Sequence, residues 1–284
     1  GLGSLAVAAD ATARSTTLVR GGATGTGVSL AGAAAITVST ILTAARIGTG
    51  PALIADGDVT VAATQVAPTT TTAKGAAEAG DVAGGAVLAL SVVDHAVLAT
   101  TERDLVATGT ITISVGGASS ATTVAEAAAG GAPEDDSAGA GTNPTATEQV
   151  DGARDFAADT AGSASVPPTL PAPTAPGGTV SVAAAIAITV FSSVAIATVD
   201  GVLLDAAAVT ITATHHDLAT STATGQPAQR GPPATATIGA AIAITDASVE
   251  ITASTGPTAT IDAAAFTLSA GVGRTTAEGA PATA

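Results

Sequence analysis

The chain repeats itself, and this repetition constrains its fold more than any other feature of the sequence. A strand-like motif occurs four times, as AAAITV at residues 33–38, VLALSV at 87–92, AIAITV at 185–190 and AIAITD at 241–246. Each motif has a hydroxyl residue at the equivalent position: Thr37, Ser91, Thr189 and Thr245. Successive members of this set lie about 54, 98 and 56 residues apart. The middle spacing equals one repeat plus an insertion of about 43 residues. We therefore predict about four imperfect copies of a unit of about 55 residues.

Each copy has the pattern of several strands separated by turns. The motif is followed by a Gly or Asp turn, a short apolar run, another turn and strict alternation, as in Val59-x-Val61 and Ile111-x-Ile113. Alternating apolar residues share one face only when the chain is extended. The abundant Ala would suit a helix, but Gly, Thr and Val interrupt the runs too often. We expect about three strands of roughly five or six residues per repeat, and then a polar return such as residues 69–80 or 218–231.

The composition favours one β architecture over another. Tyr, Trp, Cys and Met are absent and only three Phe occur. A core of Ala, Val, Ile and Leu suits thin stacked layers better than the thick centre of a β-sandwich. If each repeat coils into two or three rungs, equivalent residues of successive rungs stack on one another. We predict an all-β parallel β-helix (a β-solenoid), with its repeats in residues 1–125 and 177–284.

Residues 126–176 interrupt the repeats. They are rich in Gly, Ala, Asp, Glu and Pro, include the run VPPTLPAPTAP, and have no sustained periodicity. Such a composition buries too little apolar surface to offset the entropy of ordering, so we expect a surface insertion or loop. A domain linker is the alternative, although the same repeat resumes afterwards.

The apolar segment at residues 180–199 is long enough to cross a bilayer. Prolines precede it, no basic residue flanks it, and β-branched residues alternate with small ones along it. This pattern favours a strand, and we expect no membrane insertion.

The charge is strongly acidic, with 23 Asp and Glu against 8 Lys and Arg and a net charge of -15. This balance argues against partners that are nucleic acids or anionic membranes, because both need clustered basic residues. The absence of Cys excludes disulfides and thiolate chemistry. We expect no cofactor, and an acidic chain of this kind suits the outside of a cell, where it could hold calcium loosely.

Three features resemble segments of large bacterial adhesin-like and filamentous-haemagglutinin-like exoproteins. They are the AxAIAITV strand, the cassette IGTGPALIADGDVTVAAT at residues 47–64, and the Gly/Ala/Asp/Pro-rich insertion between copies. The resemblance covers nearly the whole chain outside residues 126–176. It implies a right-handed parallel β-helix on a secreted stalk at the bacterial cell surface. Asn143 is the only asparagine, so the Asn ladders common in such helices cannot form, and stacking must rely on aliphatic and Thr rows.

His215, His216 and Asp217 form the most suggestive cluster for a metal ion. Neighbouring side chains of an extended segment point to opposite faces, so His215 and His216 cannot share one ion without a turn. They follow the strand VTITAT directly. We expect the start of a polar loop here rather than a metal site.

Two acidic clusters could present carboxylates to calcium. The first is Asp56-Gly57-Asp58, and the second comprises Glu134, Asp135 and Asp136. Calcium takes six to eight oxygen ligands, and no calcium-binding sequence motif is present. We therefore expect solvated turns at both places.

Asp94 and His95 could form part of a catalytic triad. No GxSxG motif occurs, and a proton relay needs three groups fixed around a cleft. The eight basic residues are also dispersed along the chain, unlike those of β-helical enzymes that degrade acidic polysaccharides. We expect a turn at Asp94 and His95, and we predict that the chain is not an enzyme.

Thr-x-Thr pairs form a candidate binding face. Residues two apart share one face of a strand, so stacked rungs would array their hydroxyl and methyl groups in flat rows. The candidate residues are Thr110, Thr112, Thr210, Thr212, Thr214, Thr235 and Thr237. Such rows could bind ice or a glycan, although Thr is also simply a good strand former on a solvated face.

These features together predict a structural or adhesive segment of a secreted or cell-surface bacterial protein, serving as a stalk or a self-assembling filament unit. Open rungs expose edge hydrogen-bonding groups, so the first expected partner is another copy of the chain, by head-to-tail or edge association. A glycan on a host or neighbouring cell is the second. The alternative is an ice- or glycan-binding solenoid that uses the Thr rows.

Overall fold

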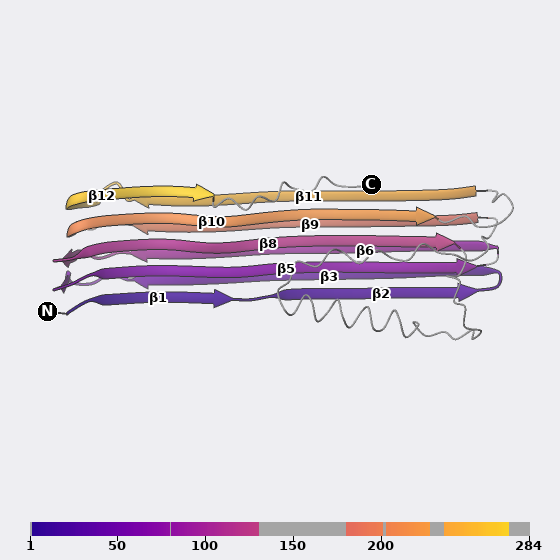
Figure 1. The fold of residues 1–284 in the computed structure, drawn as a ribbon, viewed down its shortest axis with the longest axis horizontal. Helices are drawn as coiled ribbons and strands as arrows, with labels where there is room; N and C mark the ends of the chain where they lie inside the picture. Colours follow the sequence, from indigo (N-terminus) through magenta and orange to yellow (C-terminus); the bar gives the residue numbers. More distant parts are fainter. Residues whose placement is uncertain (1, 80, 131–179, 201–202, 228–235, 273–284) are drawn as a thin grey trace.

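A computed structural model describes residues 2–79, 81–130, 180–200, 203–227 and 236–272 (Figure 1). All regular structure in these residues is β-strand, which confirms the predicted all-β class. The strands are β1 Leu5–Thr12, β2 Ser15–Gly25, β3 Val28–Ile47, β4 Leu53–Ala55, β5 Val59–Ala79, β6 Val82–Thr101, β7 Leu105–Ala107, β8 Thr110–Gly130, β9 Val180–Val199, β10 Leu203–Pro227, β11 Ala236–Thr255 and β12 Thr260–Val272.

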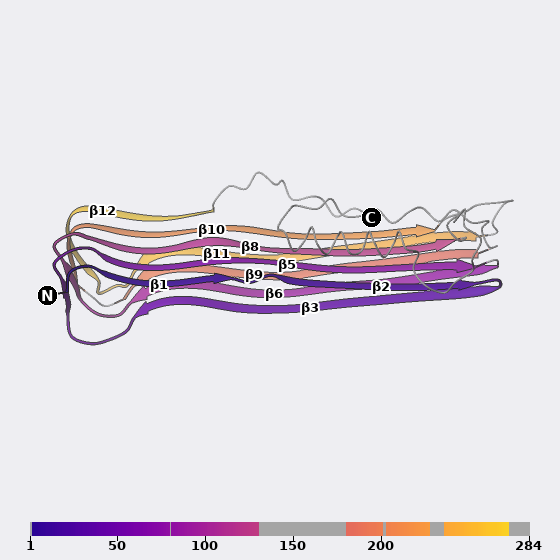
Figure 2. The same cartoon turned by 60° about the horizontal axis from the view of Figure 1, so that its bottom comes forward.

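The strands form two parallel sheets that face each other. Sheet B has the order β11-β9-β6-β3, and sheet A comprises the other eight strands, with β5, β8 and β10 as its long central members. The chain runs along one sheet, turns, and returns along the other (Figure 2). Each sheet thus pairs a strand with its equivalent from the next pass of the chain, an arrangement consistent with a parallel β-solenoid.

The register of sheet B matches the equivalences drawn from the sequence. Thr37 pairs with Ser91, Ser91 with Thr189, and Thr189 with Thr245. Sheet A aligns the predicted alternating residues in the same way, in the row Val59, Ile111, Val209 and Phe266. The spacing read from the sequence is therefore the pairing register of the sheets.

The strands are far longer than the five or six residues expected. β3, β6, β9 and β11 each have 20 residues. The expected polar return at residues 69–80 is strand through Ala79, and residues 218–227 of the other belong to β10. β8 continues to Gly130, so the first five residues of the expected insertion at 126–176 are also strand, while residues 131–176 lie outside the described residues.

A hydroxyl ladder between the sheets explains why polar segments continue as strands. Thr71 donates to Thr37 across the interior at 2.6 Å, and Thr189 donates to Thr123 at 2.7 Å. Ser221 and Thr245 extend the ladder, with Ser221 donating to Thr189 at 2.7 Å and Thr245 donating to Ser221 at 2.9 Å. Buried hydroxyl groups that hydrogen-bond to one another can replace apolar contacts, so the strands continue where the apolar alternation stops.

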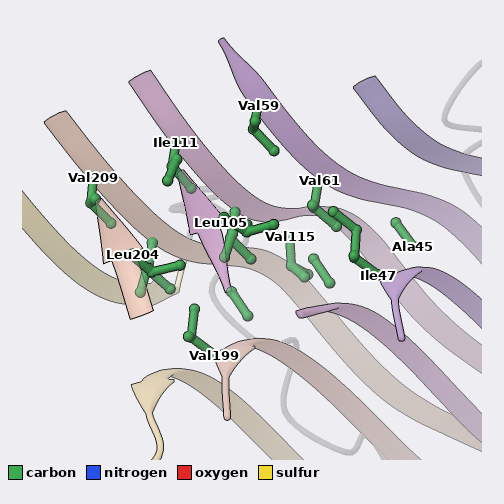
Figure 3. Packing of buried hydrophobic residues seen from close by; sticks show 14 of the residues in the cluster. Ala45, Ile47, Val59, Val61, Leu105, Ile111, Val115, Val199, Leu204 and Val209 are labelled. Atoms are coloured by element: carbon green, nitrogen blue, oxygen red, sulfur yellow. The ribbon is translucent and has the colours of Figure 1, made fainter. Parts of the chain in front are cut away.

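The apolar core fills the interior on either side of this ladder. At one end Leu105, Ile111, Ile113, Leu204 and Ile211 are fully buried, and Figure 3 shows Leu105 and Leu204 beside the row of Val59, Ile111 and Val209. The other end is lined by Ala from both sheets. A Cβ on Gly225 of β10 would lie 2.3 Å from the Ala240 carbonyl oxygen of β11, so the sheets at this end are too close for larger side chains.

No helix in the described part of the chain has the length and hydropathy needed to cross a membrane. The apolar segment at residues 180–199 is strand β9, as its β-branched pattern predicted.

Candidate functional site

The outer face of sheet A carries threonine in rows that cross the strands. One row comprises Thr60, Thr112, Thr210 and Thr267, and a second comprises Thr16, Thr70, Thr122 and Thr220. We call these eight residues, with Thr72, Thr212, Thr214 and Thr222, the threonine face. Neighbours in a row lie about 4.8 Å apart, and the two rows are ten residues, or about 33 Å, apart along the strands. Each row thus presents hydroxyl and methyl groups at a regular spacing.

The structure places most of the predicted threonines on this outer face. Thr112 pairs directly with Thr210, and Thr110, Thr212 and Thr214 lie on the same side of β8 and β10. Thr237 lies elsewhere, because it belongs to β11 of sheet B and pairs with the buried Ser181. Thr235 lies outside the described residues.

Several members of the threonine face were missed from the sequence. Thr60 and Thr267 extend the row of Thr112 and Thr210 at either side. Neither forms a Thr-x-Thr pair, but each occupies the repeat-equivalent position of Thr112. The repeat spacing was therefore the signal that could have found them.

Charged side chains also pair across rungs on the outer face of sheet A. Lys74 and Glu126 are register partners, and Lys74 Nζ lies 3.0 Å from Glu126 Oε2. The pair carries opposite charges directly across neighbouring strands, an arrangement that favours the observed register.

A second polar group lies inside the molecule, midway along the strands. His95 of β6 is fully buried, with its Nε2 2.9 Å from Ser39 Oγ and its Nδ1 3.2 Å from Ser119 Oγ. The Gln65 amide donates to Ser119 at 3.5 Å and accepts from Thr43 at 2.9 Å. Each pass of the chain contributes one or two of these side chains, so the network links both sheets.

Gly117 lies beside this network. It lies between Gln65 and His215 in the register of sheet A. Its φ is 143°, and a Cβ there would lie 2.0 Å from the Gln65 carbonyl oxygen. A side chain is therefore excluded at Gly117 by the backbone of β5, which approaches β8 closely at this point.

His215 and His216 point to opposite sides of β10. His215 is buried inside, with Nδ1 2.9 Å from Asp217 Oδ1 and 3.4 Å from Ser193 Oγ. The predicted opposition of the two rings is confirmed, but the expected loop is wrong, because both residues are in β10. The ring of His215 contacts Asp217 and Ser193 through the same nitrogen, so the three groups do not have the two-sided geometry of a catalytic relay.

Asp94 and His95 are likewise on opposite faces of one strand. Both belong to β6, with Asp94 exposed and His95 buried, so the turn expected at this place is wrong. Their side chains cannot act on one substrate from these positions.

Asp56 and Asp58, considered above for metal binding, accept hydrogen bonds from the equivalent turn of the next rung. The Thr110 amide donates to Asp58 Oδ1 at 2.7 Å, and the Thr108 hydroxyl donates to the carbonyl of Asp56 at 2.6 Å. In the described part of the chain, no group of three or more His, Asp or Glu could hold a metal ion, so Asp56, Asp58, His215 and His216 are not brought together. Glu134, Asp135 and Asp136 lie outside the described residues.

Comparison of the chain with protein-family models, with curated protein sequences and with solved structures gave no match.

The buried network predicts a loss of stability in mild acid. Burial lowers the pKa of His95 below its ordinary value of 6.5, and His215 adds to this effect, while Asp94 and Asp217 oppose it. The unfolded chain then binds the proton more readily than the folded chain, so the free energy of unfolding should fall as the pH drops below about 6.5. Urea unfolding at pH values above and below 6.5 measures this pH dependence of the free energy of unfolding. A His95→Gln variant should show a shallower decline, and an unchanged decline would remove His95 as its cause.

Proposed function

We propose that this chain is a structural segment of a bacterial cell-surface protein, a β-solenoid of about four imperfect repeats that serves as a stalk or filament unit. The observation that carries the proposal is the parallel register, which continues along whole strands from β3 through β6 and β9 to β11. A sheet built in this way can add rungs without changing its cross-section.

The end strands support growth by stacking. Phe266 and Leu268 of β12 are 48% and 46% exposed, whereas their register partners Val209 and Ile211 of β10 are buried. Val249 of β11 is also on the inner side and is 44% exposed, above the buried Ser193. A further rung placed on this end would bury these side chains and pair the open strand edge.

The dimensions predict the form of such an assembly. A strand of 20 residues is about 66 Å long, whereas each added rung lengthens the stack by only about 4.8 Å. Copies stacked end to end should therefore form ribbons of constant width, with strands running across the ribbon.

Concentration-dependent assembly tests the proposal directly. We expect negative-stain images of concentrated protein to show ribbons, and fibre diffraction to show a reflection near about 4.8 Å along the ribbon. Val249→Lys places a charge on the inner side of the open end and should abolish ribbons, because inward-pointing charges block edge pairing. Ser248→Lys, one residue away on the outer side, is the matched control and should leave them intact. A chain that remains monomeric at every concentration contradicts the self-assembling role.

The threonine face supports a second candidate function, binding to ice or to a regular glycan. Its carrying observation is the alignment of Thr60, Thr112, Thr210 and Thr267 across four strands. Thermal hysteresis and glycan-array binding test it. Thr112→Lys with Thr210→Lys should abolish either signal if the face binds, whereas Leu42→Lys on the outer face of sheet B should not.

A further inference from the structure

The outer face of sheet B is aliphatic, unlike the outer face of sheet A. In the half that begins at Val28, Val82, Val180 and Ala236, every outward position is aliphatic or Gly except Asp246. The large residues of this aliphatic face are Val28, Leu30, Ile36 and Val38 of β3, Val82, Leu88, Leu90 and Val92 of β6, Val180, Val182, Ile186, Ile188 and Val190 of β9, and Ile238, Ile242 and Ile244 of β11.

These side chains are contiguous; those of the edge strands β3 and β11 are open to solvent, and most of those of the central strands are half-buried. Leu30 and Val38 are 73% and 70% exposed, and Ile242 at the opposite edge is 51% exposed. The register aligns them into rows, for example Ile36, Leu90, Ile188 and Ile244. The face is therefore a single apolar surface across four strands rather than scattered residues.

The two outer faces differ although their backbones are alike. Sheet A carries Thr at several outward positions of β5, β8 and β10, among them Thr70, Thr122 and Thr220, whereas the outward positions in the first halves of β6 and β9 are Ile, Leu, Val, Ala or Gly. Solvation alone therefore does not account for the aliphatic residues, because Thr forms such strands equally well. Apolar patches of this kind mark interaction surfaces.

The size of the face fits a second copy of the chain. Eleven residues along four strands cover about 36 Å by about 19 Å, or roughly 700 Å² on each partner. Two such faces would bury roughly 1,400 Å², within the usual range for a specific protein interface. Aliphatic rows on two flat sheets can also interdigitate at the usual sheet separation of about 10 Å.

The charges indicate how two copies would meet. The chain carries a net charge of -15, so two copies can approach closely only where charge is absent, as on this face. Its one acid, Asp246, lies on the edge strand β11. Because Asp246 also lies at one end of the face, either two-fold axis keeps the two carboxylates apart: an axis parallel to the strands places them at opposite edges, and an axis across the strands places them at opposite ends.

We propose that the aliphatic face of sheet B packs against the same face of a second copy about a two-fold axis. The dimer joins two sheets face to face. It is distinct from stacking at the open ends and does not depend on it.

Sedimentation equilibrium of the full chain carrying Val249→Lys tests the proposal without interference from stacking. We expect a dimer at micromolar concentration. Adding Ile36→Asp and Ile242→Asp should raise the dissociation constant at least about 100-fold, because the carboxylates would be buried unpaired. The matched control adds Thr112→Asp and Thr210→Asp on the threonine face and should leave the constant unchanged. Circular dichroism should show the same strand content in all variants.

The orientation can be tested with cysteine, because the chain has none. A copy with Ile36→Cys should be joined by a short bis-maleimide to a copy with Ile244→Cys if the axis runs along the strands, or to a copy with Leu30→Cys if it runs across them. Failure of both cross-links would overturn the proposal. The proposal would be overturned if the chain stayed monomeric at all concentrations. This outcome would mean that another segment of the chain covers the aliphatic face, or that the face binds only lipid vesicles. The proposal would also be overturned if the variant with Ile36→Asp and Ile242→Asp had the same dissociation constant as the variant with Thr112→Asp and Thr210→Asp.

Discussion

Gly117→Ala should lower the free energy of unfolding by about 3 kcal/mol or more, which can suffice to unfold the chain. Two effects add at this position. The φ of 143° is one that residues with a side chain rarely adopt, and the new Cβ would meet the Gln65 carbonyl carbon at 2.9 Å and its oxygen at 2.0 Å. Because the obstacle is backbone in a central strand, it cannot move aside without breaking the pairing of β5 with β8.

Gly116→Ala is the matched control one residue earlier. A Cβ at Gly116 meets nothing within 4 Å, and its φ is not positive. Its unfolding free energy should change by less than about 0.5 kcal/mol. Urea unfolding of both variants gives the comparison, and equal losses would contradict the close approach of Gly117 to Gln65.

The register of the sheets could be predicted from the sequence, and the physical reason is simple. Parallel strands from successive passes of one chain must be one repeat apart, so the spacing of Thr37, Ser91 and Thr189 already contains the pairing. Residues 131–179 lie between β8 and β9 in the sequence, yet β9 pairs with β6 in the register that the repeat predicts.

The length of the strands could not be predicted, because the search relied on apolar alternation. β5 continues through Thr69 and Thr71, whose side chains point inward and are buried. Their partners on the opposite sheet are residues such as Thr37, which are distant in sequence. Nothing local to residues 69–80 shows that a hydroxyl group there will find a buried partner.

The candidate site was predictable only in part, for a related reason. A Thr-x-Thr pair indicates a strand face, but it does not say which sheet the strand joins. Thr112 and Thr210 were correctly placed with each other, whereas Thr237 belongs to sheet B. Alternation also predicted that His215 and His216 oppose each other, but the burial of His215 depends on β9 and on Asp217.

The second large effect is expected at Ile111, the largest of the buried residues in the row Val59, Ile111, Val209 and Phe266. Ile111→Ala removes buried methyl groups from the centre of the core and leaves a cavity, so it should cost about 2–5 kcal/mol. Thr112→Ala, on the outer side of the same strand, should change stability by less than about 0.5 kcal/mol. Similar losses for both variants would contradict the assignment of inner and outer faces.

The end of the same row connects stability to assembly. Phe266→Ala should lower the free energy of unfolding of the isolated chain much less than truncation of a buried aromatic residue would, because 48% of Phe266 is already exposed. If a further rung covers this end, Phe266 is buried only in the assembled state, and its truncation should weaken ribbon formation while leaving the urea midpoint of the dilute chain nearly unchanged. Ile111→Ala should do the reverse and lower the midpoint at every concentration. A Phe266→Ala chain that assembles as readily as the wild type would show that this end is not a stacking surface.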